Sequence, residues 1–287
     1  FSYMMNQALF YIVGFGILLV CYRIPLKWYR WISYIGIGAA AIMLMLPVFQ
    51  HELRSFEFFG VDIHPSEIAK LATVLYLARV IEAGGIDTFR QYALKILLPV
   101  GIVCALCMLG SMSATLIIGI LTLIILICAG IKREFILWTI PIAAGAVAIA
   151  FTVSVISHGK VFSRFDTFGE RIERHFSSDN TEGLSAAELA ELEGKNFQSE
   201  QAREAIQLGG ILGRGPGNSI KRDVLPNAYD DYIYSIIIEE YGLAGGLAVI
   251  VLYLWFFYRC MKIARACTRE FSILTVLGLS TLITMQA

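Results

Sequence analysis

The sequence predicts an all-α, polytopic membrane protein, and three observations lead to this fold class. Of its 287 residues, 57% are hydrophobic and only 16% are charged, whereas soluble domains carry roughly 45–50% apolar and about 25% charged residues. The mean hydropathy is +0.68. The polar residues cluster, which leaves long apolar runs without the in-out alternation of a transmembrane β-barrel. The net charge is zero, so no nucleic-acid partner is expected.

Eight apolar runs account for the expected membrane spans, and the charges between them set their direction. Alternate short loops hold twelve lysines and arginines, whereas the short loops between them hold only Arg54. Because positive residues accumulate in cytoplasmic loops, residue 1 and the long loop at 157–230 are expected outside the cell. The runs lie near 8–20, 31–48, 66–78, 96–109, 114–131, 135–156, 232–258 and 271–287.

The chain is expected to form one membrane domain over residues 1–287, as part of a longer protein. It begins without methionine and its last apolar run stops at Ala287. If the whole protein starts in the cytoplasm, an odd number of spans precedes Phe1, and one is the simplest number.

Within the long loop, two stretches have their own patterns. The segment 184–193 places apolar residues at helical spacing beside an acidic face, which predicts a short surface helix, with a partner-binding element as the alternative. The segment 208–218 is too rich in glycine for a stable helix. Its glycines let the backbone approach a ligand closely, but glycine-rich loops are also ordinary turns. No Gly-Lys-Ser/Thr follows, so this is not a Walker loop.

The six cysteines lie in or beside apolar runs, which excludes a disulfide framework in the long loop. Cys104 and Cys107 form a C-x-x-C without charged neighbours, and we interpret them as helix-packing residues rather than a redox or zinc pair. The four histidines have no ligand spacing.

Carboxylates concentrate where the long loop meets the seventh apolar run. Asp230 and Asp231 adjoin the start of that run, and Glu239 and Glu240 lie inside it. Asp231 in a first helical turn is favoured as a cap by the helix dipole. The functional interpretation is a general base or cation ligand, because adjacent carboxylates repel and raise one pKa. Ionisable groups at membrane depth are costly and usually functional.

A second charged pair lies at the start of the third run, in PSEIAK at 65–70. Pro65 suits a first helical turn, and Glu67 and Lys70 are three residues apart on one helix face. The pair could neutralise itself within the bundle or line a polar cavity for an anionic headgroup.

These motifs resemble those of the shape, elongation, division and sporulation family, which includes FtsW and RodA. LPNAYDDYIYSIIIEEYG at 225–242 matches the family in its Leu-Pro pair, its second Asp, its aromatic-Ile-aromatic triplet and its Glu-Glu-x-Gly. QS at 198–199, AIQLGGILGRGPGNS at 205–219 and PSEIAK at 65–70 also match. The resemblance covers essentially the whole chain.

The resemblance implies a peptidoglycan glycosyltransferase that polymerises lipid II at the outer face of the bacterial cytoplasmic membrane. Asp231 would be the base that deprotonates the acceptor's 4-hydroxyl, which then attacks the anomeric carbon and releases undecaprenyl pyrophosphate. The implied substrate contacts are Glu67, Lys70, Arg164, Gln198, Ser199, Arg214, Asn218 and Ser219, with Lys221 and Arg222 as further candidates for phosphate contact. Supporting roles fall to Pro65, Ser66, Asp230, Glu239 and Glu240.

No cofactor is certain from the sequence. A divalent cation, Mg²⁺ or Mn²⁺, would neutralise the pyrophosphate, with Asp231 as its candidate ligand. The resemblance implies a class B penicillin-binding protein, division proteins and membrane lipid as partners. It also implies ten spans, of which this chain holds about eight, without the first and without the last one or two.

The branch of the family and the activity both have alternatives. The EEYG continuation and the GNS before the Leu-Pro pair are more similar to FtsW, the division member, than to RodA, the elongation member. Asn227, Tyr229 and Asp230 depart from the usual Glu, His and Thr, which affects the expected substrate contacts. The competing functions are a lipid II flippase, because charges lie inside the spans, and a non-catalytic division scaffold.

Overall fold

The computed structural model describes residues 2–49, 56–58, 61–156, 186–225 and 232–287. These residues are helical almost throughout, which confirms the predicted all-α class. The elements are α1 (Ser2–Arg23), α2 (Leu26–Phe49), β1 (Phe56–Phe58), β2 (Val61–Ile63), α3 (Pro65–Ala83), α4 (Phe89–Tyr92), the π-helical turn η1 (Ala93–Leu97), α5 (Leu98–Gly110), α6 (Met112–Cys128), α7 (Arg133–Ile156), α9 (Ala186–Gly209), the 3-10 turn η2 (Lys221–Asp223), α10 (Ile233–Ala266) and α11 (Glu270–Gln286).

The chain divides into two compact units. Unit 1 comprises Phe1–Phe168 with Cys260–Gln286, and unit 2 comprises Gly169–Arg259 with Ala287. The expectation of one membrane domain over 1–287 stays a prediction. All eight predicted apolar runs coincide with helices, and the run at 96–109 covers η1 and α5.

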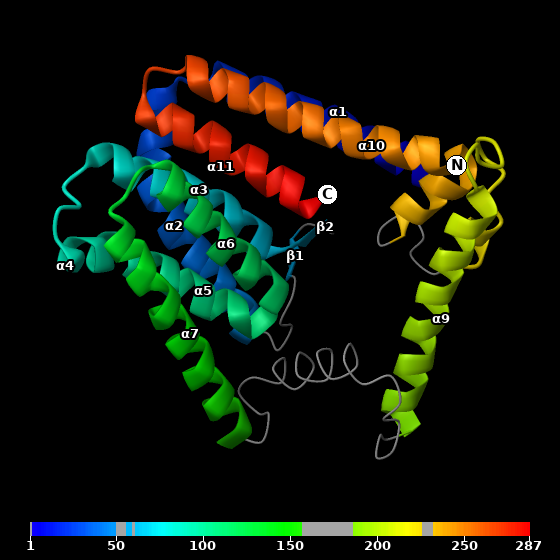
Figure 1. Cartoon of the computed structure of the whole chain (residues 1–287), viewed down its shortest axis with the longest axis horizontal. Helices are drawn as coiled ribbons and strands as arrows, with labels where there is room; N and C mark the ends of the chain where they lie inside the picture. Colours follow the sequence, from blue (N-terminus) through cyan, green and yellow to red (C-terminus); the bar gives the residue numbers. More distant parts are fainter. Residues whose placement is uncertain (1, 50–55, 59–60, 157–185, 226–231) are drawn as a thin grey trace. The chain divides into compact units, whose positions relative to one another are not determined.

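Unit 1 is a helical bundle centred on α3. Helix α3 contacts α2, α5, α6 and α11 (Figure 1), and eleven of its nineteen residues are buried. Small residues allow this close packing, because Ala69, Ala72 and Ala78 are almost fully buried on α3. A side chain at Gly278 of α11 would meet Val74 and Ile125, so α11 approaches α3 and α6 at this glycine.

The first turn of α3 is set by its flanking residues. Strands β1 and β2 pair antiparallel, with Phe56 opposite Ile63, and β2 leads directly into the helix. Pro65 opens the helix, where its missing N–H is not needed. Sequence reasoning did not find this hairpin, because strands of three residues are too short to show a periodic pattern.

The helix Phe89–Gly110 is continuous, but its regular α-helical pattern changes to a π-helical turn between α4 and α5, just before Pro99. Proline has no N–H, so it cannot donate to the carbonyl oxygen of Lys95 one helical turn earlier. The hydroxyl of Tyr76 on α3 donates to that oxygen instead, at 2.7 Å. The freed carbonyl thereby ties α5 to the centre of the bundle, and the turn before it is π-helical.

Three helices in the described residues are long and apolar enough to cross a membrane: Leu26–Leu46, Phe89–Gly110 and Ile233–Ala266. Shorter apolar helices cover Ala8–Arg23, Met112–Cys128 and Glu270–Gln286. Helix α10 continues beyond the predicted end at residue 258, because charged residues such as Arg259 and Lys262 mark the membrane border rather than the end of the helix.

Unit 2 consists of α9, a glycine-rich loop, η2 and most of α10. Helix α9 covers 24 residues rather than the ten of the predicted surface helix at 184–193. The apolar pattern weakens after residue 193, but no proline interrupts the backbone before Gly209, so the helix continues as a mainly polar one. Two alanines of its last turns, Ala202 and Ala205, are buried.

Candidate functional site

The predicted base and its neighbour lie outside the described residues, but the residues on both sides of them are described. Asp230, Asp231 and also Arg164 fall in segments that the structure does not describe. Leu225 before the acidic segment is 5% exposed and packs with Ile236, and Tyr232 after the segment packs against the same cluster. The two ends of the acidic segment therefore meet on one face of α10.

Helix α10 is broken at Gly242, and the glycine-rich loop fills the break. Gly242 has a φ of 71° and a ψ of −175°, which is not helical. The carbonyl oxygens of Glu239 and Glu240 accept hydrogen bonds from the backbone N–H groups of Arg214 and Gly215. On the other side of the break, the loop carbonyls of Gly210 and Ile211 accept from α10. The loop thus satisfies backbone groups that would be costly to leave unpaired in a membrane.

Glycine is required where the loop and the helix touch. A Cβ atom at Gly209 would overlap the carbonyl oxygen of Ile238, and one at Gly213 would overlap that of Glu240. A Cβ atom at Gly242 would overlap the carbonyl oxygen of Ile211. The glycines at these positions allow close approach of two backbones, a role that the sequence did not predict. Approach to a ligand by this loop stays a prediction.

The carboxylate of Glu239 is fully buried and holds the residues that follow the loop. Its oxygens accept from the hydroxyl of Ser219 at 2.5 Å and from the backbone N–H of Ile220 at 2.9 Å. The N–H of Lys221 lies 3.4 Å from the same carboxylate. A buried carboxylate needs such donors, so Glu239 fixes the turn at 219–221 against α10.

Lys221 extends this arrangement to α9. Its ammonium group donates to Gln201 at 2.6 Å and forms an ion pair with Glu204. Near the start of α10, the hydroxyl of Tyr232 lies 3.5 Å from Gln198 Oε1, which is long for a hydrogen bond. Lys221 is therefore engaged by α9, although the sequence pointed to it as a phosphate contact.

Other predicted contacts of unit 2 lie on or near the loop. Arg214 is exposed, and among the described residues none accepts a hydrogen bond from its guanidinium group. The side-chain amide of Asn218 donates to the carbonyl oxygen of Arg214 at 3.2 Å. Ser199 is exposed on α9, and Glu240 is partly exposed. Substrate contact by these residues stays a prediction.

The second charged pair is present in unit 1. Lys70 is 3% exposed, and its ammonium group lies 2.6 Å from Glu67 Oε1. The side chain of Glu67 is about half exposed, and its other oxygen accepts from Gln286 Nε2 at 2.9 Å. Pro65 is buried in the first turn, and Ser66 is partly buried. The expectation that Glu67 and Lys70 share a helix face is confirmed.

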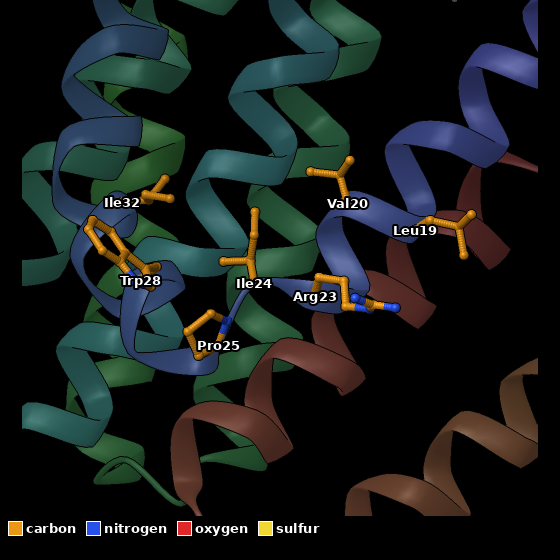
Figure 2. Close-up of a pocket in the computed structure, with 7 residues that line it drawn as sticks. All are labelled: Leu19, Val20, Arg23, Ile24, Pro25, Trp28 and Ile32. Atoms are coloured by element: carbon orange, nitrogen blue, oxygen red, sulfur yellow. The ribbon is translucent and has the colours of Figure 1, made fainter.

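An open groove in unit 1 contains none of the predicted site residues. It has a volume of about 680 Å³ and lies at the turn from α1 to α2 (Figure 2). Arg23 is its only charged lining residue. The groove lacks an acid or nucleophile, so it is not the candidate site. Its lining residues are Leu19, Val20, Arg23, Ile24, Pro25, Trp28 and Ile32.

The predicted cation has no further support in the described part of the chain. No three His, Cys, Asp or Glu residues gather there as metal ligands. Asp231, the candidate ligand, lies outside that part. The cation therefore stays a prediction.

Sequence reasoning missed the partners of Glu239 and Lys221. The contacts join residues 17–20 positions apart in the sequence, and only the folded loop brings them together. The sequence contained one signal of the Ser219–Glu239 contact, because the GNS at 217–219 and the Glu-Glu of α10 occur together in one family pattern.

Comparisons with known proteins agree on the family. The family model described as "Cell cycle protein" (FtsW, RodA, SpoVE) matches residues 1–287. A "Probable peptidoglycan glycosyltransferase FtsW" from Nitrosomonas europaea is 24% identical and covers 100% of this chain and 72% of that relative. The protein of the same name from Bacillus subtilis is 28% identical and covers 81% of this chain and 56% of that relative.

Two solved structures have the same fold. A structure described as "Structural coordination of polymerization and crosslinking by a peptidoglycan synthase complex" matches with a TM-score of 0.63 and 20% identity, over 96% of this chain and 74% of that one. Thermus thermophilus RodA, a rod shape determining protein, matches with a TM-score of 0.57 and 18% identity, over 95% and 70%. The chain belongs to the FtsW, RodA and SpoVE family of polytopic helical membrane proteins.

Proposed function

We propose that this chain carries the membrane domain of a peptidoglycan glycosyltransferase that polymerises lipid II. Membership of the family supports the proposal, as do the names of the relatives from Nitrosomonas europaea and Bacillus subtilis. These relatives are less than 30% identical to the chain, and the chain spans 56–72% of their length. We therefore base the proposed activity on the chemistry of the site as well as on family membership.

The observation that carries the proposal is the construction around the start of α10. Asp231 directly precedes Tyr232, and the helix that follows is broken and braced by the glycine-rich loop. Non-helical backbone at membrane depth is tolerated where it is buried in protein or lines a cavity. Asp231 precedes the break at Gly242 by eleven residues of the sequence. A carboxylate at the start of such a helix, where the membrane span begins, suits a base that acts on a lipid-linked substrate.

In the proposed reaction, the carboxylate of Asp231 takes the proton from the acceptor's 4-hydroxyl. The hydroxyl oxygen forms a bond to the anomeric carbon of the lipid-linked chain, and the bond from that carbon to the pyrophosphate oxygen breaks. Undecaprenyl pyrophosphate leaves with the electron pair, and the configuration at the carbon inverts. Arg214, which has no described acceptor, is the candidate for stabilising the charge on the leaving group.

We place the reaction at the outer face of the bacterial cytoplasmic membrane during cell division. The bias of lysine and arginine supports the outer location of the long loop. The relatives' name, FtsW, favours the division role over the elongation role. The matching synthase complex is described as coordinating polymerization and crosslinking, which supports a class B penicillin-binding protein as the partner, together with division proteins.

A lipid II flippase is the second candidate, because two observations favour it. Lys70 is buried inside the bundle, and α10 is a broken helix, a device that transporters use near their substrate sites. A flippase moves lipid II between leaflets without forming glycan.

The decisive experiment uses the full-length protein with its penicillin-binding partner and labelled lipid II. We expect the wild type to form glycan strands and Asp231→Asn to lose at least about 100-fold in rate, because a general base contributes about 10²–10⁴-fold. Glu200→Gln is the matched control, since Glu200 is an exposed carboxylate on α9. Wild-type turnover in Asp231→Asn would refute the assigned base, and transfer of lipid II without polymer would favour the flippase.

A further inference from the structure

A continuous chain of contacts connects α10 to α9 by way of the segment that leads to the acidic pair. It starts at the carboxylate of Glu239, passes through the turn at 219–221 and ends at Glu204. All of these residues lie in unit 2. Their described contacts are with one another and with the turn between them, which indicates a role other than substrate contact.

The first contact is buried and rich in donors. Glu239 is 0% exposed and Ser219 is 6% exposed. Ser219 uses both properties of its hydroxyl, because it donates to Glu239 and accepts from the N–H of Arg222 at 3.1 Å. A buried carboxylate that accepts from several donors is held more firmly than a surface one. The turn at 219–221 is therefore fixed relative to the break in α10.

The second contact, made by Lys221, links the turn at 219–221 to α9. The side chain of Lys221 is largely buried, at 14% exposure, and its ammonium group binds Glu204 and Gln201. Gln201 lies one turn after Gln198, the residue that faces the hydroxyl of Tyr232. Lys221 thus attaches α9 to the turn at 219–221, which Glu239 holds against α10, and Gln198 of α9 lies near Tyr232 just before α10.

The consequence concerns the two ends of the acidic segment. The N–H of Leu225 donates to the carbonyl oxygen of Lys221 at 2.9 Å, so the turn at 219–221 sets where Leu225 lies. Leu225 then packs with Ile236 and Tyr232 on α10. The point at which the chain enters 226–231 therefore depends on the turn at 219–221, and it packs beside Tyr232, the point at which the chain leaves that segment.

We propose that Glu239, Lys221 and Glu204 are positioning residues that set the placement of Asp231 for glycosyl transfer. This inference rests on the proposed function. The three side chains act through the flanking residues Leu225 and Tyr232 and do not touch the reacting atoms. Substrate binding is then largely independent of them, whereas the rate of the chemical step depends on them, since small misplacements of a catalytic group are costly.

The test reverses the more accessible ion pair. In full-length protein with its partner and lipid II, we expect Lys221→Glu and Glu204→Lys each to lower kcat per folded molecule by about 10- to 100-fold, with KM changed less than about 2-fold. The double variant Lys221→Glu with Glu204→Lys restores kcat to within about 3-fold of the wild type. Glu200→Lys, one turn earlier on the exposed side of α9, is the matched control and keeps the wild-type kcat.

A second readout does not depend on activity. Spin labels at exposed positions 200 and 243 report the distance between α9 and α10 within unit 2. We expect this distance distribution to broaden in Glu204→Lys and to narrow again in the double variant. A distribution that stays unchanged in the single variants overturns the proposal, whatever the enzyme does.

Running Asp231→Asn in parallel separates the two claims. If Asp231→Asn is inactive while Lys221→Glu keeps the wild-type kcat, positioning is overturned and the proposed function stands. If Asp231→Asn is fully active, the assigned base is wrong, and so is positioning through it. Loss of folded protein with unchanged kcat per folded molecule reduces the three residues to a structural role and also overturns the proposal.

Discussion

Glu239 and Glu240 are neighbours in the sequence, but their carboxylates have different surroundings. Glu239 is fully buried and accepts from Ser219 and from two backbone N–H groups, whereas Glu240 is partly exposed and no described hydrogen bond reaches its carboxylate. The helix accounts for this difference, because successive side chains point about 100° apart around its axis. Two identical residues in one motif therefore have separate roles.

The Glu67–Lys70 pair is asymmetric, which leads to a prediction at this scale. Lys70 is buried with Glu67 as its described partner, whereas Glu67 is half exposed and keeps a bond to Gln286. We expect Glu67→Leu to destabilise the protein by roughly 1–3 kcal/mol, between the values for surface and buried pairs, because it leaves an unpaired buried ammonium group. Lys70→Met is expected to be milder.

Thermal unfolding of the purified protein in detergent, followed by size-exclusion chromatography, checks whether Glu67→Leu is less stable than Lys70→Met. The same variants separate stability from activity, since Lys70→Met is expected to lose lipid II polymerisation while it stays folded. Equal thermal midpoints for the two variants, or a lower midpoint for Lys70→Met, would contradict the argument. Unchanged turnover in Lys70→Met would reduce the pair to a structural role.

At the residue scale, sequence reasoning succeeded where partners are close in the chain. Glu67 and Lys70 are three residues apart in a helix, so their pairing follows from helix geometry. The partners of Glu239 come from a turn about twenty residues earlier, which reaches α10 only after the glycine-rich loop folds. No local periodicity contains this information.

At the scale of elements, α10 shows why a membrane helix is predicted more easily than its break. The apolar pattern at 232–258 predicted one continuous span, and the helix is there. Glycine is frequent in membrane helices without breaking them, so Gly242 alone gave no signal. The break depends on the loop that supplies hydrogen bonds on both sides of it.

The loop leads to a prediction that separates backbone strain from close contact. Gly213 and Gly217 have nearly the same φ, 78° and 77°, but only at Gly213 would a Cβ atom overlap α10, while nothing lies within 4 Å at Gly217. We expect Gly217→Ala to cost roughly 1–2 kcal/mol, the usual strain of a left-handed residue. Gly213→Ala adds the overlap with Glu240 and is expected to cost more.

Recovery of folded protein from membranes and its thermal midpoint in detergent measure the difference. Gly119→Ala serves as the control, because Gly119 lies in α6 with open space around it. It is expected to be neutral or slightly stabilising, since alanine favours helices over glycine. If Gly213→Ala and Gly217→Ala lower the thermal midpoint equally, the close contact of Gly213 with α10 does not contribute to the cost of the substitution.

At the scale of the whole molecule, the orientation of the chain across the membrane is set by charged residues rather than by the packing of apolar helices. At the end of α3, Glu82 binds Arg79 on its own helix and Arg30 on α2, at 2.8 and 2.7 Å. The sequence places these arginines on the cytoplasmic side. Helix packing is the same for either direction, so the bundle of unit 1 could not by itself decide the topology.

Native cysteines provide the test of this topology. The predicted direction puts Cys128, the last residue of α6, and Cys267, between α10 and α11, at the cytoplasmic side, and neither is fully buried. In intact spheroplasts, a membrane-impermeant maleimide is therefore expected to leave both thiols unmodified, and to modify them once the membrane is permeabilised. Glu200→Cys, exposed on α9, is expected to react in intact spheroplasts. Peptide mapping assigns each label, and modification of Cys267 before permeabilisation would invert the topology and move Asp231 to the cytoplasmic face, away from the outer face where we place the polymerisation.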